Sequence, residues 1–316
     1  MKSEKLSFTN VLKEQSQVMI LVLLVLVFSI ITPSFRTTGN FINLLKQITV
    51  IGVISCGMTM VVITGCLDLS VGSVFSLLGL IAILFQQRNN LLGIIMPIVA
   101  AVIIGLFNGF IVTKYKVNSI IVTLGSLSLF SGIALLITNG AIISGRTGTW
   151  FGMIGREKFL GIPNHVYVLF VVAIIYHIIL SRTTFGRKIK YVGTNSSAAE
   201  IAGIRSNRVR TIAFIISSVS VAIAVIIYSS RMTTASPVIG VGYEFDAITA
   251  VVIGGTSLVG GKGSIFKTIV GVLLLATIIN ILTLYNVPFA FQNIIKGILI
   301  IIAIIVDIRA RKRSEN

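Results

Sequence analysis

Long apolar runs separated by short polar segments dominate the chain. A hydrocarbon core about 30 Å thick requires roughly 20 mostly apolar residues per helix, and about ten runs of this kind can be placed. The eighth run is too short to cross alone, so it either extends through Gly240 and Gly242 or crosses only partly. The runs cover residues 17–34, 47–64, 71–87, 91–113, 119–138, 165–181, 211–229, 245–254, 265–284 and 290–307.

Two glycine-rich breaks interrupt this apolar pattern, at residues 65–73 and 254–264. Backbone that leaves helical geometry at membrane depth needs protein or a water-filled cavity to satisfy its N–H and C=O groups. The breaks therefore predict broken or re-entrant segments along a translocation path.

The two breaks also resemble each other in sequence. Val61–Ile63 precedes the first break as Val251–Ile253 precedes the second, and Gly72–Phe75 matches Gly263–Phe266. Transporters often contain internal repeats that place broken helices around a central site. The count of runs makes the two copies parallel, whereas a half-crossing at either break would invert one. Chance similarity between Gly- and Val-rich segments is the alternative.

The composition agrees with a protein of the lipid bilayer. The 316 residues are 55% hydrophobic and 11% charged, compared with roughly 25% charged residues in soluble domains. No linker or low-complexity segment divides the chain. We therefore expect a single all-α, polytopic membrane domain over residues 1–316.

The net charge of +17 is spread over short loops. Because cytoplasmic loops are enriched in Lys and Arg, the basic residues near both ends of the chain and in the stretch 181–210 predict that both termini are cytoplasmic. The charge is then a topology signal rather than the electrostatic footprint of a nucleic-acid-binding protein, and no nucleic-acid partner is expected. The polar stretch 139–164 falls on the predicted outer side, where it either receives a partner or is a plain loop.

Catalytic and metal-binding motifs are not recognisable. A phosphate-binding loop needs Gly-x-x-x-x-Gly-Lys-Ser/Thr, but Gly260–Ser264 has Thr256 at the first glycine position and Gly263 after Lys262. The two histidines, His165 and His177, have no carboxylate or thiol at metal-ligand spacing. We expect neither catalysis, nor a metal, nor a bound cofactor, and we do not expect this chain to hydrolyse ATP itself.

Polar and ionisable residues at membrane depth are candidates for the substrate path, because burying them there is costly. Asp68 lies in the first break, where it is either a helix cap or a substrate contact, and Lys296 is expected to pair with Glu244 or Asp246. Hydroxyl and amide side chains suit an uncharged solute better than a charged one. The predicted path consists of Asp68, Ser70, Ser73, Asn108, Thr123, Glu244, Asp246, Thr256 and Ser257.

Gly105 and Gly109 have the small-xxx-small spacing that lets membrane helices approach closely. We expect a tight helix contact at this pair. Asn108, between them, either bonds across helices or faces the path.

The cytoplasmic loop 181–210 contains a short capped segment. Gly193–Ser196 is read as a turn, Ser197–Glu200 has the form of a capping box, and Gly203 supplies a left-handed stop. Such a protruding turn between basic residues either is gripped by a partner or is an ordinary loop at lipid head groups. The residues predicted to contact such a partner, here called the coupling segment, are Gly193, Asn195, Ser197, Ala198, Ala199, Glu200 and Gly203.

A set of short motifs is spread along nearly the whole chain: Asp68–Ser73, Asn108-Gly109, Thr123–Gly125, Gly186-Arg187, Asn195, Ala198-Ala199, Gly203-Ile204, Gly242–Glu244, Gly254–Leu258 and Gly260–Gly263. Together these motifs resemble those of the permease subunits of ribose-type ABC importers for simple sugars. The sequence departs from the residues common in that family at Cys66, Leu67, Thr194 and Phe245, so the identity of the sugar does not follow from the resemblance.

The resemblance implies a homodimer of subunits with about ten helices, of the type II importer kind, in a bacterial cell membrane. Each subunit would contact a cytoplasmic ATPase, the separate partner subunit that hydrolyses ATP, through the capped segment. It would receive solute from an extracytoplasmic sugar-binding protein. The expected function is import of a small uncharged solute, such as ribose. A permease for a nucleoside, a branched-chain amino acid or a furanone-type signal is the nearest alternative. An ion-coupled secondary transporter using Asp68 or Glu244 is a different class, which the capped loop argues against.

Overall fold

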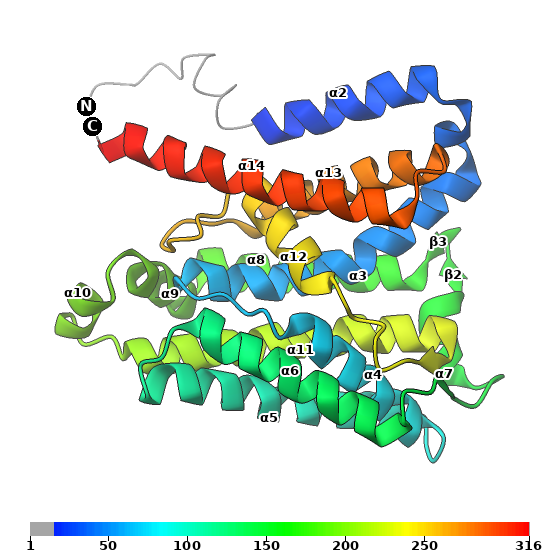
Figure 1. Ribbon diagram of the computed structural model, residues 1–316, viewed down its shortest axis with the longest axis horizontal. Coiled ribbons are helices and arrows are strands. Elements are labelled where there is room, and N and C mark those ends of the chain that lie inside the picture. The colour runs from blue at the N-terminus through cyan, green and yellow to red at the C-terminus, as the bar shows by residue number, and fades with distance from the viewer. Residues whose placement is uncertain (1–15, 316) are drawn as a thin grey trace.

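Helices arranged roughly along one direction make up most of the structure (Figure 1). The computed structural model describes residues 16–315. The long helices are α2 (Ser16–Ile31), α3 (Thr38–Ile63), α4 (Val71–Gln86), α5 (Leu92–Lys114), α6 (Ser119–Thr138), α8 (Asn164–Arg182), α11 (Ser206–Met232), α13 (Ile265–Leu284) and α14 (Phe289–Glu315). The shorter elements are η1 (Pro33–Arg36), α7 (Trp150–Arg156), α9 (Thr184–Thr194), α10 (Ser196–Ile201), α12 (Tyr243–Ile253), β1 (Ile143–Ser144), β2 (Lys158–Phe159), β3 (Ile162–Pro163) and β4 (Thr234–Ala235).

Each of the ten predicted apolar runs contains a helix. Among the described residues, seven helices are long and apolar enough to cross a membrane by themselves. The remaining three runs correspond to α2, α4 and α12. The expectation of an all-α polytopic membrane protein is confirmed.

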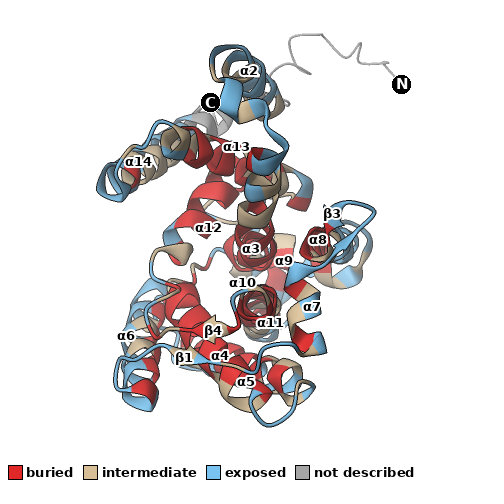
Figure 2. Ribbon diagram, turned by 90° about the vertical axis from the view of Figure 1, so that its right-hand side faces the viewer, coloured by how far each residue is buried: buried red, intermediate tan, exposed pale blue. Residues whose placement is uncertain are grey.

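The centre of the bundle is formed by α3 and α11, and its periphery faces outward with apolar side chains. The apolar window of α3 is 89% buried, whereas that of α14 is 6% buried. Figure 2 shows the buried residues concentrated on α3, α11, α4 and α12. Because apolar side chains are exposed on α5, α6, α8 and α14, these helices are suited to contact lipid.

Small residues allow α5 and α11 to pack backbone to backbone. A Cβ atom added to Gly105 would lie 2.5 Å from the Cα atom of Ile215, and one added to Gly109 would lie 2.7 Å from the Cα atom of Thr211. Real Cβ atoms do not approach that closely. The predicted tight contact at these two glycines is therefore confirmed.

The eighth run crosses only partly as a helix. At 1.5 Å rise per residue, the 11 residues of α12 span only about 16 Å. The chain reaches α12 from the end of α11 through a mostly non-helical segment that ends at Gly242, whose φ is +95°. In Figure 1, α12 starts near the middle of the bundle and runs toward the end that carries α10, which we call the α10 end. The opposite end, which carries α7, is called the α7 end.

The two similar breaks have the same direction. Both α3 and α12 run into a break at the α10 end, and both α4 and α13 then run toward the α7 end (Figure 1). The backbone N–H of Gly261 in the second break donates to the carbonyl of Ile63 at the end of α3, at 2.8 Å. The copies are thus parallel, as the count of runs predicted, although α12 is a partial crossing.

Residues 139–164 are structured rather than a plain loop. Strand β1 pairs with β4 in an antiparallel ladder, and β2 pairs with β3. The buried side chain of Gln86 accepts from the N–H of Arg146 at 2.8 Å and donates to its carbonyl at 3.0 Å. These bonds hold the start of the segment against the end of α4.

Residues 181–210 differ from the predicted single capped turn. They form two helices, α9 and α10, before α11 begins. Gly193 and Thr194, predicted to be in a turn, belong to the last turn of α9. The tertiary contact of Gly193 described below explains why a poor helix former ends that helix.

Candidate translocation path and coupling segment

The first turns of α4 and α12 lie against each other inside the bundle. A Cβ atom on Gly72 would fall 2.5 Å from the carbonyl oxygen of Gly240 and would overlap the carboxylate of Glu244. The N–H of Gly240 donates to Ser76 Oγ at 2.9 Å. Because helix N-termini carry partial positive charge, Glu244 places a negative charge where two such termini meet.

At the start of α4, Asp68 organises a buried hydrogen-bond network, defined here as the Asp68 network. Its Oδ1 atom accepts from the N–H of Ser70 at 3.1 Å and from Ser70 Oγ at 2.6 Å. Ser217 Oγ on α11 donates to Oδ2 at 3.4 Å. Asn108 Nδ2 donates to Ser70 Oγ at 2.9 Å, and Ser126 Oγ donates to Asn108 Oδ1 at 2.6 Å.

The Asp68 network is closed to the outside. Asp68 is 1% exposed, and Ser70, Asn108 and Thr123 are completely buried. Thr123 Oγ1 donates to the carbonyl of Ser119 at 2.8 Å. The network therefore joins the start of α4 to α5, α6 and α11, and Asp68 takes the cap-like position that was one of its two predicted roles.

A second polar group lies between α12 and α14. Lys296 Nζ is 2.8 Å from Asp246 Oδ1 and donates to Asp246 Oδ2 at 3.0 Å. Their side chains are 18% and 9% exposed. The expected pairing of Lys296 with a carboxylate is confirmed, and the partner is Asp246 rather than Glu244. Glu244 instead accepts from the N–H of Gly242 at 3.3 Å.

Two cavities border the Asp246–Lys296 ion pair. One, of about 850 Å³, is lined by the pair itself and by Ser236, Val238, Ile239, Val241, Gly242, Phe245, Phe289, Asn293, Gly297 and Ile300. The other, of about 410 Å³, is lined by Lys46, Arg231, Tyr243 and the same pair. The ion pair therefore stands at the boundary between an aromatic-lined cavity and a basic one.

The predicted path residues thus fall into separate groups. Asp68, Ser70 and Asn108 belong to the Asp68 network, and Ser73 Oγ donates to the Ser70 carbonyl at 2.8 Å beside it. Thr123 is buried next to the network but bonds to backbone carbonyls, those of Ser119 at 2.8 Å and Leu67 at 3.5 Å. Glu244 and Asp246 lie in the first turn of α12.

Thr256 and Ser257 lie elsewhere, in the second break at the α10 end. Thr256 is buried, and its hydroxyl has no hydrogen-bond partner within residues 16–315. The N–H of Ser257 donates to the carbonyl of Lys262 at 3.1 Å, which closes the turn of the break. These two residues are placed nearer to the coupling segment than to the carboxylates.

Both breaks and the end of α9 meet at a glycine junction, formed by Gly65, Gly193, Gly260 and Gly261. A Cβ atom on Gly260 would lie 2.8 Å from the N atom of Gly65 and 2.9 Å from the carbonyl oxygen of Gly193. One on Gly193 would overlap the Ile63 carbonyl and lie 2.5 Å from the Gly261 N atom. Sequence reasoning did not find this junction, although the glycines concentrated in both breaks were the available signal.

The short helix α10 projects from the α10 end of the bundle (Figure 1). Its N-cap is Asn195, whose side chain accepts from the N–H of Ala198 at 3.0 Å. The predicted capping box is wrong, because Ser197 lies inside the helix rather than at its N-cap.

The end of α10 agrees with the prediction that Gly203 stops the helix in a left-handed conformation. Gly203, at φ +80°, follows the helix, its N–H donates to the carbonyl of Glu200, and that of Ile204 donates to the carbonyl of Ala199. This pair of bonds is a Schellman motif. Ala199 is buried toward the bundle, whereas Ile201 is 90% exposed.

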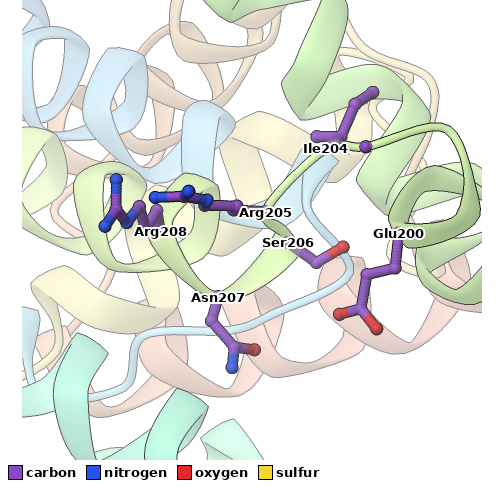
Figure 3. A pocket seen from close by; sticks show the side chains of 7 residues that line it. Glu200, Ile204, Arg205, Ser206, Asn207 and Arg208 are labelled. Atoms are coloured by element: carbon purple, nitrogen blue, oxygen red, sulfur yellow. The ribbon is translucent and has the colours of Figure 1, made fainter.

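A cavity of about 540 Å³ lies where α10 gives way to α11. Figure 3 shows Arg205 and Arg208 lying to one side of the connecting loop, with Glu200 and Asn207 on another. A further cavity of about 410 Å³ reaches from α10 to Gly65 and Cys66 of the first break. The α10 region thus offers an exposed apolar residue with basic neighbours, directly connected to both breaks.

No group of three or more His, Cys, Asp or Glu side chains that would hold a metal ion occurs in the part of the chain that the structure describes. The two cysteines, Cys56 and Cys66, are free and buried.

Comparison with known proteins gives a consistent set of matches. Residues 40–304 match the family model described as "Branched-chain amino acid transport system / permease component". The chain is 37% identical to the ribose import permease protein RbsC of Bacillus subtilis, with 99% of this chain and 97% of that protein covered. It is 36% identical to the Escherichia coli protein of the same name, with 94% of each covered.

The similarity extends to arabinose permeases. The chain is 34% identical to the L-arabinose transport system permease protein AraH of Escherichia coli, with 98% of this chain and 94% of that protein covered. No solved structure matches the chain.

Proposed function

The chain belongs to the family of permease components described for branched-chain amino acid transport, and on this premise we propose that it is the membrane-spanning permease subunit of an ABC importer for a small uncharged monosaccharide such as ribose. The observation that carries the proposal is the nearly full-length identity to ribose and arabinose permeases. A nucleoside, amino acid or furanone-type solute is not favoured, because the relatives described above are sugar permeases.

A cytoplasmic ATPase is the proposed partner at the α10 end. The exposed Ile201 projects from α10, and Arg205 and Arg208 follow it. An apolar residue flanked by basic side chains suits insertion into a groove with an acidic rim. With the ATPase bound there, the α10 end, and with it the carboxyl end of α14, would face the cytoplasm. The expected position of the N-terminus rests on residues outside those described.

The glycine junction supports a route by which movement reaches the breaks. When the partner ATPases close on ATP, they would displace α10 and α9. Because Gly193 packs directly on the backbone of both breaks, α9 cannot move without moving them. Alternating access would then follow as the breaks and their helices tilt between two arrangements.

At the α7 end we propose that an extracytoplasmic sugar-binding protein docks. Helix α7 and the β2–β3 hairpin expose Trp150, Phe159 and Leu160 there. Aromatic residues are enriched at interface cores. The fixed position of this segment, held by Gln86, gives the binding protein a rigid surface on which to release its solute.

A homodimer is proposed as the working unit in the membrane. The cavity beside Asp246 and Lys296 is bordered by the surface helix α14, and charged groups at membrane depth face a protein interior or a water-filled space rather than lipid. A second copy packed against this face would enclose the cavity.

Reconstitution tests the proposed function. The chain would be placed in proteoliposomes with its ATPase and loaded binding protein, and ATP-dependent uptake of D-ribose measured. We expect Ile201→Asp to abolish co-purification of the ATPase and uptake, because it places a charge in the proposed apolar contact. Ile142→Asp is the matched control for co-purification of the ATPase, since Ile142 is also exposed, at 67%, but lies at the α7 end, away from the proposed ATPase contact. Uptake that persists without any ATPase would overturn the proposal.

A further inference from the structure

The larger cavity beside the ion pair has an uneven lining. Phe245 and Phe289 are exposed aromatic side chains on one part of its wall, and Asp246, Lys296 and Asn293 supply the polar groups. Its volume of about 850 Å³ falls within the range of roughly 300–1,000 Å³ typical of small-molecule sites. An apolar wall with a few convergent polar groups is the usual form of such sites.

The ion pair retains unused hydrogen-bond capacity. An ammonium group has three donors and an ionised carboxylate has about four acceptor positions. Lys296 Nζ donates one hydrogen bond, to Asp246 Oδ2, and lies 2.8 Å from Oδ1, which is a buried atom without a hydrogen-bond partner within residues 16–315. At least one N–H of Lys296 and the free acceptor positions of Asp246 Oδ2 are therefore left for another molecule. Vicinal hydroxyl groups, which both donate and accept, match this pairing.

The charge of the pair selects the class of solute. Together the ammonium and carboxylate are neutral, so they give no net attraction to an anion or a cation. A buried ion pair is also a weak source of stability, because desolvation offsets its attraction. Its position on the wall of a cavity is therefore better explained by what it contacts there than by what it contributes to folding.

We propose that this cavity is a transient binding site for one polyhydroxylated ring, with the hydroxyls on Asp246 and Lys296 and the ring carbons on Phe245 and Phe289. The inference rests on the proposed function and adds the place and the chemistry of solute contact. The occupant is the transported sugar, and the site is expected to bind weakly because its polar groups are few.

Gly297 gives a probe inside the cavity. It lines the wall, and a Cβ atom there would meet nothing within 4 Å. The Gly297→Cys thiol would be labelled with a maleimide in the assembled transporter, with and without D-ribose, while the native Cys56 and Cys66 are buried. We expect D-ribose to slow labelling in a concentration-dependent way and leucine not to do so.

Two variants separate binding from structure. Asp246→Leu with Lys296→Met removes the polar end and keeps the packing, and Phe245→Leu removes one aromatic face. Since loss of a hydrogen-bonding or packing group weakens recognition about 10-fold or more, each should raise the half-protecting D-ribose concentration about 10-fold. The yield of assembled complex should be unchanged. A purely structural tether would leave protection by D-ribose as in the parent.

The outcomes are distinguishable. D-ribose import without protection at Gly297→Cys overturns this inference and leaves the proposed function standing. Disulfide cross-linking between two copies through the Gly297→Cys thiols, with labelling blocked regardless of sugar, means that a second copy fills the cavity and also overturns it. Failure of the complete transporter to import any sugar overturns the proposed function and this inference together.

Discussion

The Asp68 network and the Asp246–Lys296 ion pair occupy comparable places, since Asp68 lies just before α4 and Asp246 lies in the first turn of α12, and the starts of these two helices meet inside the bundle. Each buries a carboxylate, but in a different way. Asp68 is surrounded by neutral donors and is shut off from any exposed surface. Asp246 is balanced by a cation and borders two cavities. The difference teaches that a buried carboxylate can serve to fix helices where hydrogen bonds enclose it, and to contact a solute where a cavity adjoins it.

The largest expected loss of stability comes from removing one charge of the Asp246–Lys296 ion pair. Asp246→Ala leaves the Lys296 ammonium without its partner, and removing one member of a buried pair costs about 3–5 kcal/mol. Thermal unfolding of the purified protein in detergent would measure the loss. Asp246→Leu combined with Lys296→Met is the control, and it should recover most of that stability. Equal melting temperatures for the single and double variants would contradict the assignment.

The next largest loss of stability is expected at Gly72, where the first turn of α4 touches the first turn of α12. Gly72→Ala would press a methyl group into Glu244 and the carbonyl of Gly240, and overpacking of this kind typically costs about 1–3 kcal/mol. We expect slower sugar uptake as well as a lower melting temperature, because α4 and α12 would have to separate. Gly125→Ala is the matched control, since a Cβ atom there meets nothing within 4 Å.

In the Asp68 network, the shape of the side chain at position 68 should affect stability more than its charge does. Asp68→Leu removes the acceptor for the Ser70 N–H and hydroxyl and should cost about 1–3 kcal/mol, the usual penalty for stranded buried donors. Asp68→Asn keeps an oxygen in place, so its melting temperature should lie close to that of the parent. If Asp68→Asn proved as damaging as Asp68→Leu, the negative charge itself would be required and the contrast with Asp246 would disappear.

The smallest effect on stability is expected at the N-cap of α10, the helix from which movement of the ATPase would pass to both regions. Asn195→Ala removes the side-chain acceptor for the Ala198 N–H, and loss of an N-cap costs about 1 kcal/mol. The global melting temperature should hardly change, but ATP hydrolysis should become less tightly coupled to uptake. Asn195→Asp retains the cap and serves as the control. A normal ratio of uptake to hydrolysis in Asn195→Ala would exclude a role for the ordered helix in coupling.

Periodicity and composition were sufficient for much of the fold. Each apolar run contains a helix because some 20 apolar residues have few other stable arrangements in lipid. For the short eighth run the sequence left extension and partial crossing as alternatives, and the structure shows a helix of partial length. The contacts at Gly105 and Gly109, the stop at Gly203 and the pairing of Lys296 also followed from local chemistry.

Contacts between distant segments were the part that sequence reasoning missed. Gly193 was predicted to be in a turn because glycine is a poor helix former, but its helical position is imposed by the approach of Ile63 and Gly261. The choice of Asn195 over Ser197 as the N-cap likewise depends on where α9 ends. The grouping of Thr256 and Ser257 with the coupling segment required knowledge of how the second break folds onto the first.

The dependence of α14 on α12 has a consequence for how the protein is made. A lysine near the centre of a membrane helix raises the free energy of insertion by about 2.5–3.5 kcal/mol, and Lys296 lies within the apolar stretch of α14. Asp246 lies 50 residues earlier in the chain, so it is synthesised before α14. Because pairing with Asp246 offsets part of the cost of placing Lys296 in lipid, we expect α14 to insert more efficiently when α12 is correctly placed.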